Sequence, residues 1–302
     1  MMSSAVTEPE AIARDGGEVE RYRPLLFSLA YRMLGSVADA EDAVQEAYLR
    51  WHRASPDEVR SPKDYLCAVV TRLCIDHLRS ARVRREEYVG PWLPEPLLEP
   101  VEEDPLEAAI LAESLSMAFL LLLERLSPVE RAVFLLREVF SFEYAEVARI
   151  VGKSEAACRQ LARRAREKVA VGEPRHPASR NEAERLALRF MDVCARGDVD
   201  GVRALLAEDA VALTDGGGKV LAARNPIHGR DRVARFFAGI GRKWTRTRVR
   251  IAPVNGSHGI FFWLGDTLRV ISFSVRDGLI DGIYVVANPD KLRHAPQSPR
   301  SG

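Results

Sequence analysis

The stretch from Ser127 to Val169 constrains the fold of this chain most, because it holds two helix starts separated by a glycine turn. Residues 127–130 combine an N-cap serine, a proline at the first helical position and a glutamate three residues after the cap. A short helix over 143–151 should end at Gly152, which can take a positive φ without a Cβ penalty, and Ser154 can cap the next helix. The pattern predicts a helix-turn-helix.

The two faces of the second predicted helix differ in chemistry. Cys158 and Leu161 continue an apolar seam from the first helix, so Cys158 is expected in the core. The outward face carries Ser154, Glu155, Arg159, Gln160, Arg163 and Arg164. Such side chains suit base edges and phosphates, so we expect this helix to contact duplex DNA. The alternative is an ordinary amphipathic helix with a solvated basic side.

Composition indicates a multidomain protein without a membrane span. A chain of 302 residues has room for two or three domains, and no apolar run approaches the roughly 20 residues that cross a bilayer. The polar N-terminus has no signal-peptide core, so a cytoplasmic location is expected. The cysteines at 67, 74, 158 and 194 form no C-x-x-C pair, and we expect reduced, buried thiols with no metal and no cofactor.

Helices are expected over 18–34 and 39–51. The second presents Asp39, Asp42, Gln45, Glu46 and Arg50 on its outward side, which from the residues alone indicates a solvated or docking face. A third helix starts at Ser61, and the stretch that contains it is strongly basic. Its interleaved charges and aromatics, including Arg60, Lys63, Tyr65, Arg72 and Arg79, suit a groove that follows nucleic-acid phosphates.

Residues 86–105 are acidic and rich in proline, which predicts an extended linker. Its core, Trp92–Leu97, is too apolar for a simple spacer, so we expect it to dock on another surface. A leucine-rich helix over 106–126 should follow. After a second linker at 171–180, the pattern changes to helices at 179–196 and near 202–206, a helix at 230–240, and strands. The strands are expected at 211–214, 220–224, 247–254, 260–264, 267–275 and 279–287. This predicts an α+β domain whose curved antiparallel sheet has a pocket in its concave face.

Several of these segments resemble a known family. Asp39–Ala47, the basic helix around Asp76 and Gly152–Arg166 resemble regions 2 and 4 of an extracytoplasmic-function (ECF) sigma factor, over about residues 18 to 170. The remainder resembles a SnoaL-like domain. The segments Trp92–Leu97, Asp215–Lys219 and Asn288–Leu292 resemble motifs of the subgroup in which this domain is fused to the sigma factor.

The resemblance implies two all-α sigma domains, a region 2 helical bundle and a region 4 helix-turn-helix, followed by the α+β domain. The implied boundaries are a disordered N-terminus at 1–17, region 2 at 18–85, the acidic linker at 86–105, region 4 at 106–170, a linker at 171–180, the SnoaL-like domain at 181–288 and a tail at 289–302.

The resemblance also implies partners and roles. Asp39, Asp42, Gln45, Glu46 and Arg50 would bind core RNA polymerase. Arg60, Lys63, Tyr65, Arg72 and Arg79 would hold the unpaired −10 strand of promoter DNA. The 154–166 helix would contact the −35 duplex, and the acidic linker would run toward the active-site channel of the polymerase.

The C-terminal domain is expected to act as a built-in regulatory module. Its candidate contacts are Trp92, Pro94, Asp215, Lys219, Asn288, Asp290 and Lys291, with Asp290 and Lys291 free to pair with the sigma domains or polymerase. SnoaL-like polyketide cyclases use an acidic residue, but Asp215 precedes three glycines, and a turn explains it without catalysis. We therefore expect no catalytic residues, and whether the pocket holds a small molecule stays open.

Two other classes of function compete with a polymerase subunit. A free-standing helix-turn-helix regulator with a ligand-binding C-terminal domain would leave the basic helix and the acidic linker unexplained. An enzyme with an accessory DNA-binding domain would need converging acid and base groups, and the histidines and aspartates of the C-terminal domain have no spacing that requires this. Co-purification with core polymerase separates the first class from the other two.

Overall fold

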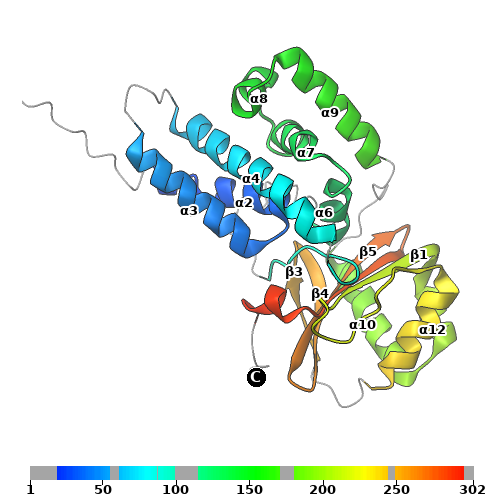
Figure 1. Ribbon diagram of the computed structural model, residues 1–302. Coiled ribbons are helices and arrows are strands. Elements are labelled where there is room, and N and C mark those ends of the chain that lie inside the picture. Colours follow the sequence, from blue (N-terminus) through cyan, green and yellow to red (C-terminus); the bar gives the residue numbers. More distant parts are fainter. Residues whose placement is uncertain are drawn as a thin grey trace, which may run out of the picture.

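The computed structural model describes residues 19–54, 61–86, 88–98, 115–170, 180–243 and 249–295. Two groups of helices form the N-terminal half, and an α+β domain lies below them (Figure 1). The expected N-terminal segment 1–17 and parts of both predicted linkers lie outside the described residues.

The first helical unit consists of α2 (Arg23–Leu34), α3 (Val37–Arg53) and α4 (Pro62–Glu86). Gly35 ends α2 in the left-handed conformation, with φ 68°. The hydroxyl of Ser36 then caps α3. The prediction of one helix over 18–34 is wrong at its start, since a turn at 21–22 precedes α2. Pro24 explains this start, because proline lacks an amide hydrogen and fits the first turn of a helix.

The second helical unit consists of α6 (Met117–Leu123), α7 (Pro128–Phe134), the π-helix η2 (Leu135–Val139), α8 (Tyr144–Val151) and α9 (Glu155–Ala170). The capping box at Ser127 is confirmed, because the Glu130 carboxylate accepts a hydrogen bond from the Ser127 amide at 2.9 Å and the Ser127 hydroxyl caps the Glu130 amide. Gly152, with φ 68°, ends α8 as predicted. The helix predicted over 106–126 ends earlier, at Leu123, and its first part lies outside the described residues.

The C-terminal domain begins with α10 (Arg180–Arg196) and α11 (Val199–Leu205). Its other elements are β1 (Leu206–Asp215), β2 (Ile227–His228), α12 (Arg230–Gly241), β3 (Val249–Val254), β4 (Ser257–Leu264), β5 (Thr267–Arg276), β6 (Leu279–Val286) and the 3-10 helix η4 (Pro289–Leu292). The strands form one sheet in the order β2-β1-β6-β5-β4-β3.

Two predictions for this domain are wrong. The sheet is mixed rather than antiparallel, because β1 pairs with β6 in parallel. Residues 220–224 form a loop and not a strand, and Leu221 there is 89% exposed. A short apolar run does not distinguish a strand from a loop, since a strand also needs a pairing partner that tertiary structure supplies.

The sheet is covered on both faces. One face packs on α10 and α12, where Phe190 contacts Phe237 and Phe273 edge to face. The other face packs against Leu93, which lies in the segment 88–98, and against Met117 of α6. We call residues 88–98 the linker segment, because they connect the two helical units. The linker segment is therefore part of the core of the C-terminal domain.

Candidate promoter-binding surfaces and linker-binding site

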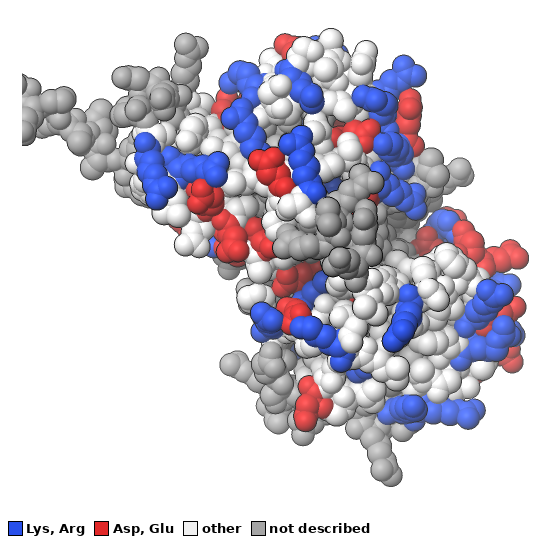
Figure 2. All heavy atoms as spheres, viewed as in Figure 1, with Lys and Arg blue, Asp and Glu red and all other residues white. Residues whose placement is uncertain are grey.

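The outward face of α9 is open to a partner. The six predicted contact residues, Ser154, Glu155, Arg159, Gln160, Arg163 and Arg164, are all exposed. Cys158, Ala162 and Ala165 are buried on the opposite face, as expected for the core side of the helix-turn-helix. Figure 2 shows basic side chains over α8 and α9, with acidic side chains among them.

Two of these arginines are held in place by neighbours on the surface. Arg159 donates to Glu155 at 2.9 Å, and its guanidinium lies 4.6 Å from the centroid of the Tyr144 ring. Arg163 donates to Glu167 at 3.0 Å. Exposed pairs of this spacing contribute only about 0.3–0.5 kcal/mol, so the arginines are oriented but can exchange these carboxylates for phosphates.

The predicted −10 residues on α4 lie in different surroundings. Arg72 and Arg79 are exposed, whereas Tyr65 is half-buried with its ring edge-on to Trp51 at 5.8 Å. Arg60 lies outside the described residues. Lys63 is exposed as well, so three of the described members of this set have side chains that a nucleic acid can reach.

The predicted polymerase-binding residues follow one side of α3. Asp42, Gln45 and Arg50 are exposed, and Asp39 and Glu46 are half-buried. In Figure 2, acidic side chains lie along α3, and basic ones gather at its C-terminal end. This separation of charge gives the helix a distinct polar face for a protein partner.

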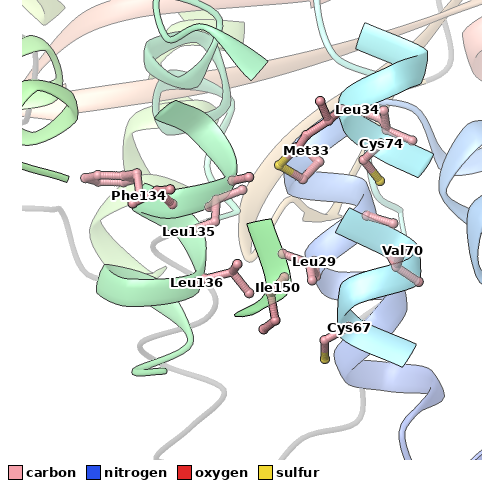
Figure 3. Close-up of a cluster of buried hydrophobic side chains, with 14 of the residues drawn as sticks. Leu29, Met33, Leu34, Cys67, Val70, Cys74, Phe134, Leu135, Leu136 and Ile150 are labelled. Carbon is pink, nitrogen blue, oxygen red and sulfur yellow. The ribbon is translucent and has the colours of Figure 1, made fainter. Parts of the chain in front are cut away.

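The two helical units share one buried core (Figure 3). It contains Leu29, Met33 and Leu34 from α2, Cys67, Val70 and Cys74 from α4, and Phe134, Leu135, Leu136 and Ile150 from α7, η2 and α8. All four cysteines of the chain are free and buried, as predicted. Burial raises the pKa of the Cys67 thiol to about 12. The units are therefore packed against each other as one body.

Polar contacts also cross this interface. Arg131 of α7, with a side chain only 4% exposed, donates to the backbone carbonyl of Met33 at 2.6 Å. Arg149 of α8 pairs with Asp64 of α4 at 2.9 Å. The ammonium of Lys63, a predicted −10 residue, lies 4.8 Å from the centroid of the Phe142 ring, which belongs to the second unit. One exposed residue of the predicted −10 set therefore also contacts the second unit.

A buried carboxylate holds the linker segment on the C-terminal domain. The side chain of Asp215, at the end of β1, is 0% exposed. It accepts hydrogen bonds from the Tyr88 hydroxyl at 2.5 Å, the Leu93 amide at 2.9 Å, the Gly217 amide at 3.0 Å and the Lys291 ammonium at 2.7 Å. Three segments far apart in the sequence thus meet at one charge. We call this group of residues the linker clamp.

Lys291 provides the positive charge of the clamp. Its side chain is 13% exposed, and it donates to the Leu93 carbonyl as well as to Asp215. Its ammonium lies 4.2 Å from the centroid of the Trp92 ring and 5.1 Å from that of Tyr88. Burial, together with the bond to Asp215, raises the pKa of the Tyr88 phenol, so the phenol stays a hydrogen-bond donor.

Asn288 completes the clamp. Its side-chain amide donates to the Tyr88 hydroxyl at 2.9 Å, and its backbone amide donates to the Asp215 carbonyl at 2.9 Å. This residue therefore orients both the phenol and the end of β1.

The expectation that Asp290 and Lys291 lie free for the sigma domains or polymerase is wrong. Lys291 is bound to Asp215, and Asp290 pairs with Lys219 and, at 2.7 Å, with Arg293. Hydrogen bonds from Lys219 and Arg293 lower the pKa of Asp290. These charges are satisfied within the C-terminal domain, where the fold brings η4 next to the end of β1 and the turn that follows it.

The other end of the linker segment binds the first helical unit. The Glu95 carboxylate accepts from the Val37 amide at 2.8 Å at the start of α3, and the Glu95 amide donates to the Gly35 carbonyl at 2.8 Å. Burial raises the pKa of the Glu95 carboxyl. A Cβ on Gly35 would lie 2.8 Å from the Trp92 ring and 3.4 Å from Pro94. Glycine is therefore required where the linker segment passes.

Asn255, in the turn between β3 and β4, connects all three parts of the molecule. Its side chain accepts from the Leu97 amide at 3.1 Å and donates to the Tyr31 hydroxyl at 2.7 Å and the Leu115 carbonyl at 2.9 Å. The Tyr31 hydroxyl donates in turn to the Glu95 carbonyl at 2.6 Å. One amide thus bonds to α2, to the linker segment and to the residues before α6.

Four residues of these contacts were not predicted from the sequence: Tyr31, Tyr88, Glu95 and Asn255. Glu95 lies inside the segment that was expected to dock, but nothing in that segment shows which surface receives it. Asn255-Gly256 is an ordinary hairpin turn, which explains the asparagine without any long-range contact. Buried tyrosine and asparagine side chains need partners, but their burial is not visible in the sequence.

Comparison with known proteins identifies the class. Residues 19–84 match the Sigma-70 region 2 family, residues 116–169 match Sigma-70, region 4, and residues 187–281 match the SnoaL-like domain. Together with the relatives below, these matches show that the chain belongs to the ECF RNA polymerase sigma factors and carries a fused SnoaL-like domain.

The chain is 40% identical to the ECF RNA polymerase sigma factor SigJ of Mycobacterium tuberculosis (strain ATCC 25618 / H37Rv) over an alignment of 302 positions, which covers 94% of this chain and 95% of the relative. It is 34% identical to the probable ECF RNA polymerase sigma factor SigI of the same strain, with 90% and 92% covered. The crystal structure of M. tuberculosis SigJ is similar with a TM-score of 0.76 and 37% identity, covering 93% of this chain and 99% of that one.

Across the part of the chain that the structure describes, no helix is long and apolar enough to cross a membrane. The same residues contain no group of three or more His, Cys, Asp or Glu side chains that could hold a metal ion.

Proposed function

We propose that this sigma factor directs core RNA polymerase to promoters in the cytoplasm, and that its C-terminal domain restrains it by holding the linker segment. The exposed residues of α3 bind the polymerase, Arg72 and Arg79 contact the unpaired −10 strand, and α9 contacts the −35 duplex. The C-terminal domain performs no chemistry in this proposal. Its role is to bind another part of the same chain.

The observation that carries the proposal is the linker clamp. A fully buried aspartate with four hydrogen-bond donors is a specific site, because a buried charge is costly unless it is paired and hydrogen-bonded. Three of those donors come from the linker segment and η4. Covalent attachment gives the domain an effective concentration in the millimolar range, so the clamp is formed without a separate partner.

The packing of the two helical units supports the proposal that the described state is restrained. The promoter elements at −35 and −10 lie about 25 base pairs apart along the DNA. This separation is ~85 Å at about 3.4 Å per base pair. Here the two helical units share a buried core, and Lys63 faces the second unit. The units must therefore separate before both elements are bound. The linker segment, which connects them, must then leave Asp215 or carry the C-terminal domain with it.

The test is promoter-specific transcription by core polymerase with the wild-type chain, Asp215→Asn or Asp290→Asn. We expect Asp215→Asn to raise transcription severalfold, because the linker segment is released. Asp290→Asn, which changes an exposed carboxylate beside the clamp, is the matched control and should behave as wild type. Unchanged or lower transcription by a folded Asp215→Asn protein would refute the restraint.

A second measurement separates a polymerase subunit from a free-standing regulator. Without core enzyme the chain should bind promoter duplex weakly, because α8 and α9 form the one helix-turn-helix among the described elements and would contact the −35 element alone. Tight, sequence-specific binding by the isolated chain, with no gain from polymerase, would favour the regulator.

A further inference from the structure

The C-terminal domain contains a cavity of about 290 Å³ between α12 and the face of the sheet that packs on it. Its walls are mostly apolar and include Phe236, Phe237, Ile240, Phe262, Ile271 and Val285. At about 30 Å³ per water-sized group, the cavity has room for about ten non-hydrogen atoms. The sequence predicted a pocket in the concave face of the sheet. The side chains that line the cavity indicate which class of ligand it can bind.

One charged side chain interrupts the apolar wall. Arg269 of β5 lines the cavity, and its Nη2 makes a long hydrogen bond of 3.4 Å to the Leu221 carbonyl. Its Nη1 is buried and has no hydrogen-bond partner within the described ranges. Burial lowers the pKa of this guanidinium. Arg269 is half-buried and has no carboxylate partner among the described residues, so its buried Nη1 can donate to an anion that enters the cavity.

The rest of the lining offers no such anion. The described residues around the cavity include no carboxylate, and the hydroxyl of Thr214 is already bonded to the Ala223 carbonyl at 3.0 Å. The remaining charged residue is a second cation, Lys243, which is exposed at the end of α12. This arrangement favours binding of an acid over proton abstraction, which needs a base in the cavity.

We propose that this cavity binds a small monocarboxylic acid of about ten non-hydrogen atoms in all, with an aliphatic or aromatic body and a carboxylate that pairs with Arg269. The planar guanidinium suits a carboxylate because two parallel N–H groups can donate to its two oxygens. The apolar body fills the space between the phenylalanines of α12 and the sheet. This site is separate from Asp215 and the linker clamp.

The cavity and the linker clamp share backbone. Thr214 and Ala287 line the cavity, and each is adjacent in sequence to a clamp residue, Asp215 or Asn288. The Ala287 amide also donates to the Asp215 carbonyl at 2.8 Å. The loop 221–223, which contacts Arg269 through Leu221, follows the turn at 216–219 after one intervening residue.

This shared backbone gives the acid a route to the linker segment, and this step rests on the proposed function. A carboxylate that takes Arg269 away from the Leu221 carbonyl removes one of the contacts of the 221–223 loop and leaves the bond from Thr214 to the Ala223 carbonyl. The preceding turn contacts the linker segment, since a Cβ on Gly218 would lie 3.2 Å from Val89. Acid binding therefore loosens the clamp and raises transcription.

The test of binding is calorimetric titration of the full chain with octanoate and with 1-octanol, which share their chain length and differ in charge. We expect octanoate to bind on the order of 10- to 100-fold more tightly, as a charge-assisted hydrogen bond predicts. Arg269→Gln should remove this preference. The control Arg250→Gln changes an exposed arginine on β3 that does not line the cavity, and should keep it.

Equal affinity for the acid and the alcohol in the wild-type chain would overturn the proposal, and so would an undiminished preference in Arg269→Gln. If Arg269→Gln does not fold, Ile240→Trp is the second variant. It fills the cavity from a half-buried position on α12 and should abolish octanoate binding while Arg269 remains. Octanoate binding that survives this filling would place the acid elsewhere.

A final comparison separates this inference from the proposed function. Asp215→Asn breaks the clamp but leaves the cavity, so it should still bind octanoate in preference to 1-octanol, by at least the wild-type factor. Octanoate should raise transcription by the wild-type chain and have little further effect on Asp215→Asn. Binding without any effect on wild-type transcription would refute the coupling. Loss of the preference in Asp215→Asn would refute the separate site.

Discussion

Replacing Asp215 with asparagine removes one negative charge from a place that is closed to solvent. The Lys291 ammonium would then face a neutral amide, and the amide nitrogen would replace an oxygen that accepts from the linker segment. The shape of the side chain is almost unchanged. The experiment therefore tests the charge and its hydrogen bonds rather than packing.

The size of the effect follows from the burial of the pair. Removing one partner of a buried ion pair costs about 3–5 kcal/mol, because the other charge stays buried and unpaired. Lys291 is 13% exposed and keeps the Leu93 carbonyl and two aromatic rings. We therefore expect Asp215→Asn to destabilise the bound linker segment by about 3 kcal/mol, at the lower end of this range. At about 1.4 kcal/mol per tenfold, release of the linker segment becomes on the order of 100-fold more favourable.

Hydrogen exchange measures this release directly. The Leu93 amide donates to Asp215, so its exchange requires the linker segment to open. In Asp215→Asn, peptides covering 88–98 should exchange about 100-fold faster, while amides of β4 and β5 keep their wild-type protection. Asp290→Asn provides the comparison, because Asp290 is 40% exposed and such a pair contributes about 1 kcal/mol or less.

A role of the Asp215 charge in holding the linker segment would be refuted if Asp215→Asn left exchange of this segment at the wild-type rate, or if Asp290→Asn accelerated it equally. A double variant adds a check on the mechanism. Lys291→Met removes the unpaired ammonium, so in the Asp215→Asn background it should restore part of the lost protection.

The remaining predictions concern DNA binding, acid stability and truncation. Arg159→Ala should cost about 1–3 kcal/mol of promoter binding by the holoenzyme in filter-binding or fluorescence assays, and Arg235→Ala, exposed on α12, should cost nothing measurable. Burial opposes ionisation of Glu130, but hydrogen bonds from its lysine and serine partners lower its pKa to about 2 from 4.5. The ionised Glu130 therefore contributes to the free energy of unfolding above pH 4.5, and this contribution is lost as pH falls toward 2. Glu130→Gln should lower the melting temperature at pH 7 and make it less dependent on acid pH, as followed by circular dichroism. A chain truncated after Gly172 should bind a hydrophobic dye and associate in size-exclusion chromatography. The reason is that Met117, which is 2% exposed in the full chain, loses the sheet that covers it. A monodisperse product without dye binding would contradict this.

Local sequence signals predicted the helical framework well. The capping box at Ser127, the left-handed Gly152 and the cap at Ser154 each depend on residues within a few positions of one another, so their pattern is visible in one segment. The helical period likewise predicted the exposed face of α9 and the buried Cys158. The sequence motifs also marked all three segments that meet at the linker clamp.

Tertiary structure alone decided how those segments meet. Asp215 could be explained as a turn residue, Asn255 as a hairpin residue and Lys291 as a free charge, because each explanation satisfies every local rule. Their partners at Tyr88, Leu93 and Tyr31 lie more than 70 residues away in the sequence. Burial makes these pairings specific, since a charge or amide without water must find a protein partner, and which partner is near depends on how the whole chain packs. For the same reason the parallel pairing of β1 with β6 and the contact of Lys63 with the second unit could not be predicted from periodicity.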